Sequence, residues 1–525
     1  MSQSTNRKIA LVSAMLMVTT AVGHSFSLVK EIIVAKFFGI TGSMDAFYAA
    51  LSVPNLIGDV IIGTLSVVFI PAFISLKLKD PKEADKIASV VLNWAILLIS
   101  VIIALIFVVG PQVIEFGFHG LTPETGALAS RLLRLLSLGL LLSTAAGVIT
   151  GILNAQKHFF WPAASQMFIT AGIILMTLLF ADTLGVYALV WGLLGGLFLK
   201  AICLFPVAKA GGFKYSLTLD WKRPAIKEIL FFGAFMLAAS AAGLLNPLID
   251  QMMTSHLATG SISALNYANK AVQAPFMIFS FPMVTAVFPF FSAQAAENSM
   301  EELGYSLTRS IRMTGFIFMP MTLILTVLAG PLIRLLFQRG AFTAAAAELT
   351  SVVFICYLPQ LFFLTCGMIM SRAFFALKEF KIYLIISATL IFLNVGFNLL
   401  FINLVNPPVA GIALSTSFVQ LVMATLLFSI IKKRIASLDT GDMATGLSKI
   451  VLASLFSAAA AYFVCRGVYA GHISGSVIKQ AAAVGVSGIS GIAVFALASY
   501  FLRLDELKSM ALMIRDKICP ENAAL

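Results

Sequence analysis

Long apolar runs follow one another along the chain with only short polar breaks between them. A helix needs about 20 apolar residues to cross the roughly 30 Å of hydrocarbon in a bilayer. The mean hydropathy of +1.00, with 11% charged residues, is far from the balance of a water-soluble domain. We therefore predict an all-α membrane protein of about fourteen transmembrane helices. The predicted spans are residues 9–35, 45–75, 86–109, 129–153, 159–181, 183–208, 226–254, 261–293, 304–329, 344–371, 381–404, 406–431, 447–467 and 475–502.

The basic residues of the chain indicate its orientation in the membrane. The formal net charge is +12, with 35 Lys and Arg against 23 Asp and Glu. If the N-terminus is cytoplasmic, about 25 of the 35 basic residues fall in cytoplasmic breaks and termini, in agreement with the positive-inside rule. We therefore predict two cytoplasmic termini and a first helix that is retained. The basic residues contact anionic membrane lipids on this view, so a nucleic-acid partner is not expected.

An internal repeat relates the first six predicted spans to the next six. Residues 42–46 (GSMDA) recur as residues 260–264 (GSISA), and residues 68–73 (VFIPAF) recur as 286–291 (AVFPFF), both 218 positions later. An even number of helices separates equivalent points, so the two copies have the same orientation in the membrane. We predict two parallel six-helix lobes, residues 1–215 and 216–435, followed by two additional helices and a tail in residues 436–525.

The motifs of soluble enzymes are missing from the sequence. It has no phosphate-binding G-x-x-x-x-G-K-[ST] loop, no H-E-x-x-H pair and no dinucleotide fingerprint. The five cysteines are scattered, without the spacing of a metal site or a disulfide framework. We therefore expect a transporter, with no cofactor and no metal, and not an enzyme. An ion gradient, the membrane potential or the gradient of the substrate would then drive it, which leaves the coupling ion open.

Ionisable side chains inside predicted spans are costly and therefore mark candidate functional positions. They gather in the first two spans and in the repeat-equivalent seventh and eighth, at His24, Lys30, Glu31, Asp45, Asp59, Asp250 and Lys270. Lys30 and Lys270 are predicted to hold an anionic headgroup through their ammonium groups, with His24 as a third candidate. The alternative for both lysines is a structural bridge to a nearby carboxylate or a side chain that extends to the membrane surface.

The remaining candidates are carboxylates and amides of the same four predicted spans. The carboxylates of Asp59 and Asp250 could carry a proton or a cation, and helix–helix hydrogen bonding explains them equally well. Asn55 follows Pro54, which is predicted to bend its helix because proline removes an intrahelical hydrogen bond. Asn269 directly precedes Lys270. Together with Glu31 and Asp45, these side chains complete the predicted lining of a cavity.

Several of these segments resemble the MurJ (MviN) family of lipid II flippases, in the superfamily that also holds the MATE exporters. The resemblance rests on Lys30-Glu31 with residues 35–39 (AKFFG), and on residues 45–47, 54–56, 69–71, 267–270, 336–342 and 372–378. It implies two lobes plus two C-terminal helices in the bacterial cytoplasmic (inner) membrane. Basic residues of helices 1, 2 and 8 serve that family, and His24, Lys30 and Lys270 stand at such positions. The family's helix-2 arginine pair is absent, because residues 56–59 read LIGD.

The function that this resemblance implies is translocation of lipid II, a peptidoglycan precursor, from the inner to the outer leaflet of the cytoplasmic membrane by alternating access. An undecaprenyl-pyrophosphate-linked precursor would enter from the cytoplasmic side, its pyrophosphate held by the lysines and its prenyl tail remaining in lipid. Three alternatives stay open at this point. They are a flippase for another undecaprenyl-linked polysaccharide, an ion-coupled exporter of cationic drugs, and a scaffold that transports nothing.

Overall fold

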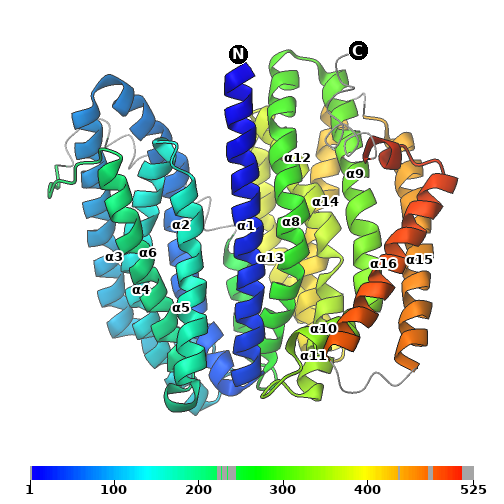
Figure 1. Cartoon of the computed structure of the whole chain (residues 1–525), viewed down its shortest axis with the longest axis horizontal. Helices are drawn as coiled ribbons and strands as arrows, with labels where there is room; N and C mark the ends of the chain where they lie inside the picture. The colour runs from blue at the N-terminus through cyan, green and yellow to red at the C-terminus, as the bar shows by residue number, and fades with distance from the viewer. Residues whose placement is uncertain are drawn as a thin grey trace. The chain divides into compact units, whose positions relative to one another are not determined.

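The computed structural model describes residues 3–220, 226, 233, 244–435, 438–470 and 477–510 (Figure 1). The regular elements of this part are helices, as the apolar runs predict. They are α1 (Gln3–Phe38), α2 (Gly42–Lys79), α3 (Pro81–Gly117), α4 (Pro123–Ala155), α5 (Phe160–Leu184), α6 (Tyr187–Ala210), α8 (Ser261–Ala296), α9 (Met300–Val327), α10 (Ala329–Phe337), α11 (Ala344–Tyr357), α12 (Gln360–Ala376), α13 (Phe380–Leu404), α14 (Pro408–Arg434), α15 (Thr440–Ala470) and α16 (Val477–Phe501). Residues 244–254 are also helical.

Twelve helices in the described part are long and apolar enough to cross a membrane. They match twelve of the predicted spans, with α11 and α12 together forming the span at residues 344–376. The first predicted span coincides with α1, which is not among the twelve, and most of the seventh lies outside the described residues. The count of fourteen therefore stays a prediction. The short helix α10 was not predicted, because its residues continue the apolar pattern of the preceding span.

The described helices form two compact units. The first contains residues 1–270 and 339–343, and the second contains residues 271–338 and 344–525. The predicted lobe boundary at residue 215 falls within an extended segment, residues 213–220. The Asn93 side chain of α3 donates hydrogen bonds to the carbonyls of Ser216 (3.2 Å) and Thr218 (2.9 Å). These bonds hold the segment on α3, so the first unit continues past residue 215.

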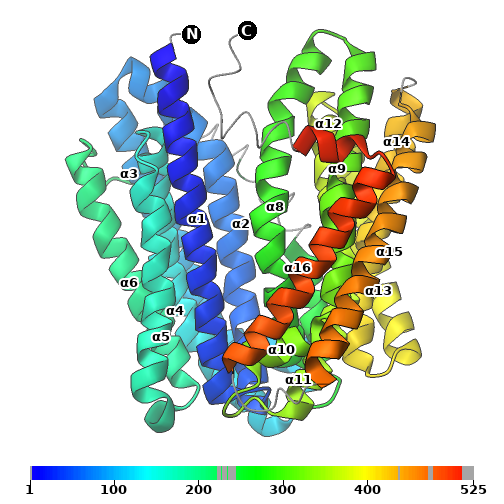
Figure 2. The same cartoon turned by 45° about the vertical axis from the view of Figure 1, so that its right-hand side comes forward.

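The first unit is held together by apolar packing among α2, α3, α4 and α6 (Figure 2). Phe69 and Phe73 of α2 are fully buried, with ring centroids 5.5 Å apart, and pack with Ile87 of α3 and Ile149 of α4. The 339–343 segment joins this unit because the Ala341 N–H donates a hydrogen bond of 2.8 Å to a carbonyl at the end of α1.

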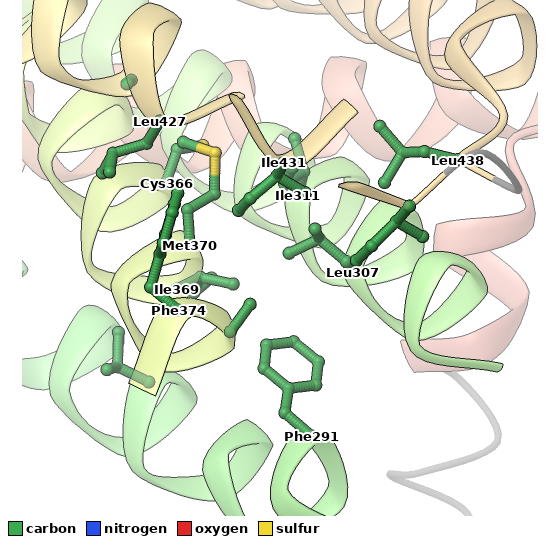
Figure 3. Close-up of a cluster of buried hydrophobic side chains, with 14 of the residues drawn as sticks. Phe291, Leu307, Ile311, Cys366, Ile369, Met370, Phe374, Leu427, Ile431 and Leu438 are labelled. Atoms are coloured by element: carbon green, nitrogen blue, oxygen red, sulfur yellow. The ribbon is translucent and has the colours of Figure 1, made fainter. Parts of the chain in front are cut away.

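The second unit has an apolar core shared by α8, α9, α12 and α14. Phe291, Ile311, Met370 and Leu427 are buried in it, and Figure 3 shows side chains from these helices converging on one another. Because lipid is as apolar as these side chains, dense packing rather than exclusion from water stabilises contacts of this kind inside a membrane.

The C-terminal helices α15 and α16 pack on α9 within the second unit. Phe316 of α9 and Phe495 of α16 meet with ring centroids 5.0 Å apart. Beside them, the Arg312 guanidinium of α9 pairs with Asp442 at the start of α15 and with Glu506 after α16, both at 2.5 Å. One arginine therefore ties both ends of the C-terminal helix pair to α9.

Candidate functional site

Lys30 and Glu31 of α1 form an ion pair inside the first unit. The Lys30 Nζ lies 2.7 Å from the Glu31 Oε1, and the two side chains are 19% and 5% exposed. Adjacent residues of a helix point about 100° apart, so the long lysine side chain has to bend around the helix to reach its neighbour. The pair compensates a carboxylate that would otherwise be buried alone. This pair is the structural bridge to a nearby carboxylate that the sequence allows as the alternative role of Lys30.

Lys270 of α8 belongs to the same group of charges. It is half-buried, and Glu31, Lys30 and Asp59 all lie close enough to interact with it electrostatically. The structure thus brings four of the predicted residues together from α1, α2 and α8. The cluster contains two ammonium groups and two carboxylates, so its formal charge is zero when all four groups are ionised.

Asp59 lies on a polar stripe of α2 that is exposed although it is within a membrane span. Asn55 and Asp59 are four residues apart and therefore on one face of the helix, and both are exposed. An ionised carboxylate facing lipid would be strongly unfavourable, so this face of α2 borders a space that water can enter.

Two buried tyrosines lie near Glu31 of the charged cluster. The rings of Tyr48 and Tyr267 meet edge to face, with centroids 6.0 Å apart, and Tyr267 also meets Phe342 at 5.5 Å. Both tyrosines interact electrostatically with Glu31. The sequence does not mark these tyrosines as functional, because a tyrosine in an apolar helix is usually a packing residue. The available signal was the position of Tyr267 three residues before Lys270, on the same helix face.

Asp45 has a different position from the other candidates. Its carboxylate, which is buried, accepts hydrogen bonds from the Gly260 N–H (2.5 Å), the Ser263 N–H (2.8 Å) and the Ser263 hydroxyl (2.6 Å). These backbone donors belong to the start of α8, where N–H groups have no partner within the helix. Asp45 therefore caps α8 from α2. Asp45 and Ser263 are also equivalent positions of the repeat, 218 residues apart.

Replacing Asp45 with alanine is expected to lower the free energy of unfolding by about 3 kcal/mol, because buried donors at the start of α8 lose their acceptor. Asp45→Asn, which keeps an acceptor oxygen, should lose less. Thermal unfolding of the purified protein in detergent measures both, with Asp59→Ala as the control for removing an exposed carboxylate from the same helix. Equal melting temperatures for Asp45→Ala and the control would contradict the capping role.

Three further candidates lie on α1, on α8 and in the helical residues 244–254. His24 is half-buried on α1, and its spacing of seven residues places it on the same helix face as Glu31. Asn269 is half-buried beside Lys270. Asp250 is buried, and its backbone carbonyl accepts a hydrogen bond of 2.6 Å from the Thr254 hydroxyl. Among the described residues, no group of three His, Cys, Asp or Glu side chains is placed to hold a metal ion.

The fold and these charges define a class of protein, a polytopic α-helical membrane protein that keeps interacting charges within its spans. A family model described as lipid II flippase MurJ matches residues 34–480. The chain therefore belongs to the lipid II flippase MurJ family.

Individual proteins agree with this assignment. A probable lipid II flippase MurJ from Borreliella burgdorferi is 24% identical over 457 residues, which cover 87% of this chain and 90% of that protein. A solved lipid II flippase MurJ in an inward closed conformation superposes with a TM-score of 0.76 at 24% identity, covering 93% of this chain and 99% of that one. An inward-facing MATE family transporter gives 0.65 at 17% identity, covering 82% and 99%. At these identities the two structures establish the fold alone.

Proposed function

We propose that this chain moves lipid II, the undecaprenyl-pyrophosphate-linked peptidoglycan precursor, from the inner to the outer leaflet of the bacterial cytoplasmic membrane. The observation that carries the proposal is the match of the family model to residues 34–480. The charged cluster of Lys30, Glu31, Asp59 and Lys270 within the spans supports it, because an anionic headgroup needs cationic partners at membrane depth. No covalent bond of the substrate changes in this process.

The ion pairing of the cluster suggests how the pyrophosphate is bound. In this structure, Glu31 and Asp59 compensate the two ammonium groups, which lowers the cost of keeping them away from bulk water. An arriving pyrophosphate replaces these carboxylates as the partner of Lys30 and Lys270. A lysine suits this exchange because its ammonium is a point charge on a flexible stem, without the fixed paired geometry of arginine. His24 supplies a further donor on the same face of α1.

Alternating access completes the proposal. The lobes built from the two repeat copies rock against each other, so that the headgroup is reached first from the cytoplasm and then from the outer side. The prenyl tail stays in lipid throughout. The excess of basic residues in alternate breaks supports cytoplasmic positions for both termini. We assign Asp250, Asn269 and Asn55 to the wall of the cavity.

Depletion of the protein in the cell that makes it tests the function. We expect lipid II to accumulate in the inner leaflet, inaccessible to a membrane-impermeant enzyme that cleaves lipid II, and re-expression of the chain to restore access. Accumulation of a different undecaprenyl-linked glycan, with lipid II still reaching the outer leaflet, would show that the substrate is that glycan and not lipid II. Accumulation of no lipid-linked intermediate would refute a flippase function.

A further inference from the structure

Lys200 is a second membrane-embedded cation that lies outside the charged cluster. It is half-buried on α6, thirteen residues after Tyr187 and ten before Ala210, which places it about 20 Å and about 15 Å from the two ends of the helix. Its Nζ donates a hydrogen bond of 2.8 Å to the Gln166 Oε1 of α5. Among the described residues, no carboxylate forms an ion pair with Lys200.

Lys200 points away from the lipid-facing side of α6. Phe198 (54% exposed) and Ile202 (51%) mark the lipid-facing side, and each is two residues away from Lys200. Two residues correspond to about 200° around a helix, so the lysine side chain is on the opposite side. The ammonium group is therefore directed into the first unit. Its position is not that of a lysine whose side chain extends along the lipid to the membrane surface.

Gln166 shows that this interior position can be reached by solvent. It is exposed, yet it lies nine residues from Leu175, which is 57% exposed on the lipid-facing side of α5. Nine residues correspond to two and a half turns, so the two side chains point in opposite directions. The exposed Gln166 side chain and its exposed hydrogen bond leave the Lys200 ammonium accessible from this side of α5.

Backbone packing holds the two side chains in place. A Cβ on Gly196 of α6 would lie 2.5 Å from the Ile169 Cα of α5, so the two helices touch through their backbones at this level. Lys200 is one turn beyond Gly196 on the same side of α6. The lysine and the glutamine are thus presented by the most closely packed pair of surfaces on the two helices and have little freedom to separate.

Donors predominate among the hydrogen-bonding groups left over by this pair. An ammonium group has three donors and no acceptor, and one donor is used on Gln166. The Gln166 oxygen accepts that bond and keeps one lone pair, beside the two N–H donors of its amide. A positively charged site with four free donors and one remaining lone pair favours an oxyanion over a cation.

We propose that Lys200 and Gln166 form a second anion site in the first unit, which binds a phosphate or carboxylate oxygen of the headgroup being transported. This proposal rests on the proposed function, because lipid II offers both kinds of group: its pyrophosphate and the carboxylates of its peptide. The cluster at Lys30 and Lys270 and the pair on α5 and α6 would then hold separate anionic parts of one substrate.

Binding measurements on the purified full-length protein test the site with two probes, lipid II and undecaprenyl pyrophosphate. We expect Lys200→Met to weaken lipid II binding about 10-fold, and Lys200→Arg, which keeps the charge and the donors, to stay near wild type. A loss restricted to lipid II identifies a peptide carboxylate as the ligand, and equal losses for both probes identify phosphate.

Unchanged affinity of Lys200→Met for both probes overturns the proposal, and so does a variant that only melts at lower temperature while its folded fraction binds normally. In that case the lysine is a helix–helix contact. Failure of the wild-type protein to bind lipid II would instead count against the proposed function. Gln166→Leu, which removes donors without changing charge, should weaken lipid II binding by a smaller factor than Lys200→Met.

Discussion

Transport by the Lys270→Met variant is expected to fall about 100-fold or more below wild type at matched protein levels. The reason is that a desolvated charge in contact with an opposite charge is commonly worth 2 kcal/mol or more, and about 2.7 kcal/mol corresponds to a factor of 100. Lys270→Arg should retain most of the activity, because the positive charge remains next to Asp59 and Glu31. Outer-leaflet lipid II in cells that depend on the variant is the measurement.

Lys270 is a cleaner test of the cluster than Lys30. Without Lys270, Glu31 keeps its ion pair with Lys30, so the fold loses little. Without Lys30, the Glu31 carboxylate, which is 5% exposed, loses its direct partner. Reduced transport could then result from misfolding and not from weaker substrate binding. The double variant Lys30→Met with Glu31→Gln removes both charges, so it should fold but transport poorly. Near-normal transport by Lys270→Met would disprove the role of the cluster.

The helical architecture could be predicted from the sequence because hydrocarbon thickness sets the length of each apolar run. Spans such as 183–208 and 406–431 therefore agree with α6 and α14 to within a few residues. The division into α9 and α10 could not be predicted in this way. A break between two helices without a polar residue leaves no mark in hydropathy, although Pro331 in the first turn of α10 has no N–H to donate to the end of α9.

The candidate site could be predicted in its members but not in its contacts. The cost of charge in a membrane selects Lys30, Asp59 and Lys270, and the structure places them near one another. The same rule selects Asp45, whose carboxylate instead caps α8. Sequence spacing cannot separate these roles, because they depend on which donors another helix brings close. Lys200 lies outside the repeat-equivalent first pair of helices in each lobe, so the pattern that groups the other charges does not include it.

The largest loss of stability is expected for Arg312→Ala, at about 3 to 5 kcal/mol. Arg312 is 11% exposed and Glu506 is 6% exposed, so the substitution leaves a buried carboxylate without its cation. Asp442 is 51% exposed, and water would take over its solvation at little cost. The expected loss therefore comes mainly from Glu506. Thermal unfolding in detergent should show a lower melting temperature for Arg312→Ala than for Arg309→Ala, an exposed arginine one turn earlier on α9.

The same arginine explains how two helices outside the internal repeat are held on α9. If it fastens α15 and the end of α16, its removal should release the residues after α16, and trypsin should then cut after Arg503 and Lys508 sooner than in wild type. Adding Glu506→Gln to Arg312→Ala removes the orphaned charge and should recover part of the stability without restoring the attachment. A double variant as unstable as the single one would contradict this assignment, because the loss would then arise from packing around the arginine stem rather than from the unpaired carboxylate.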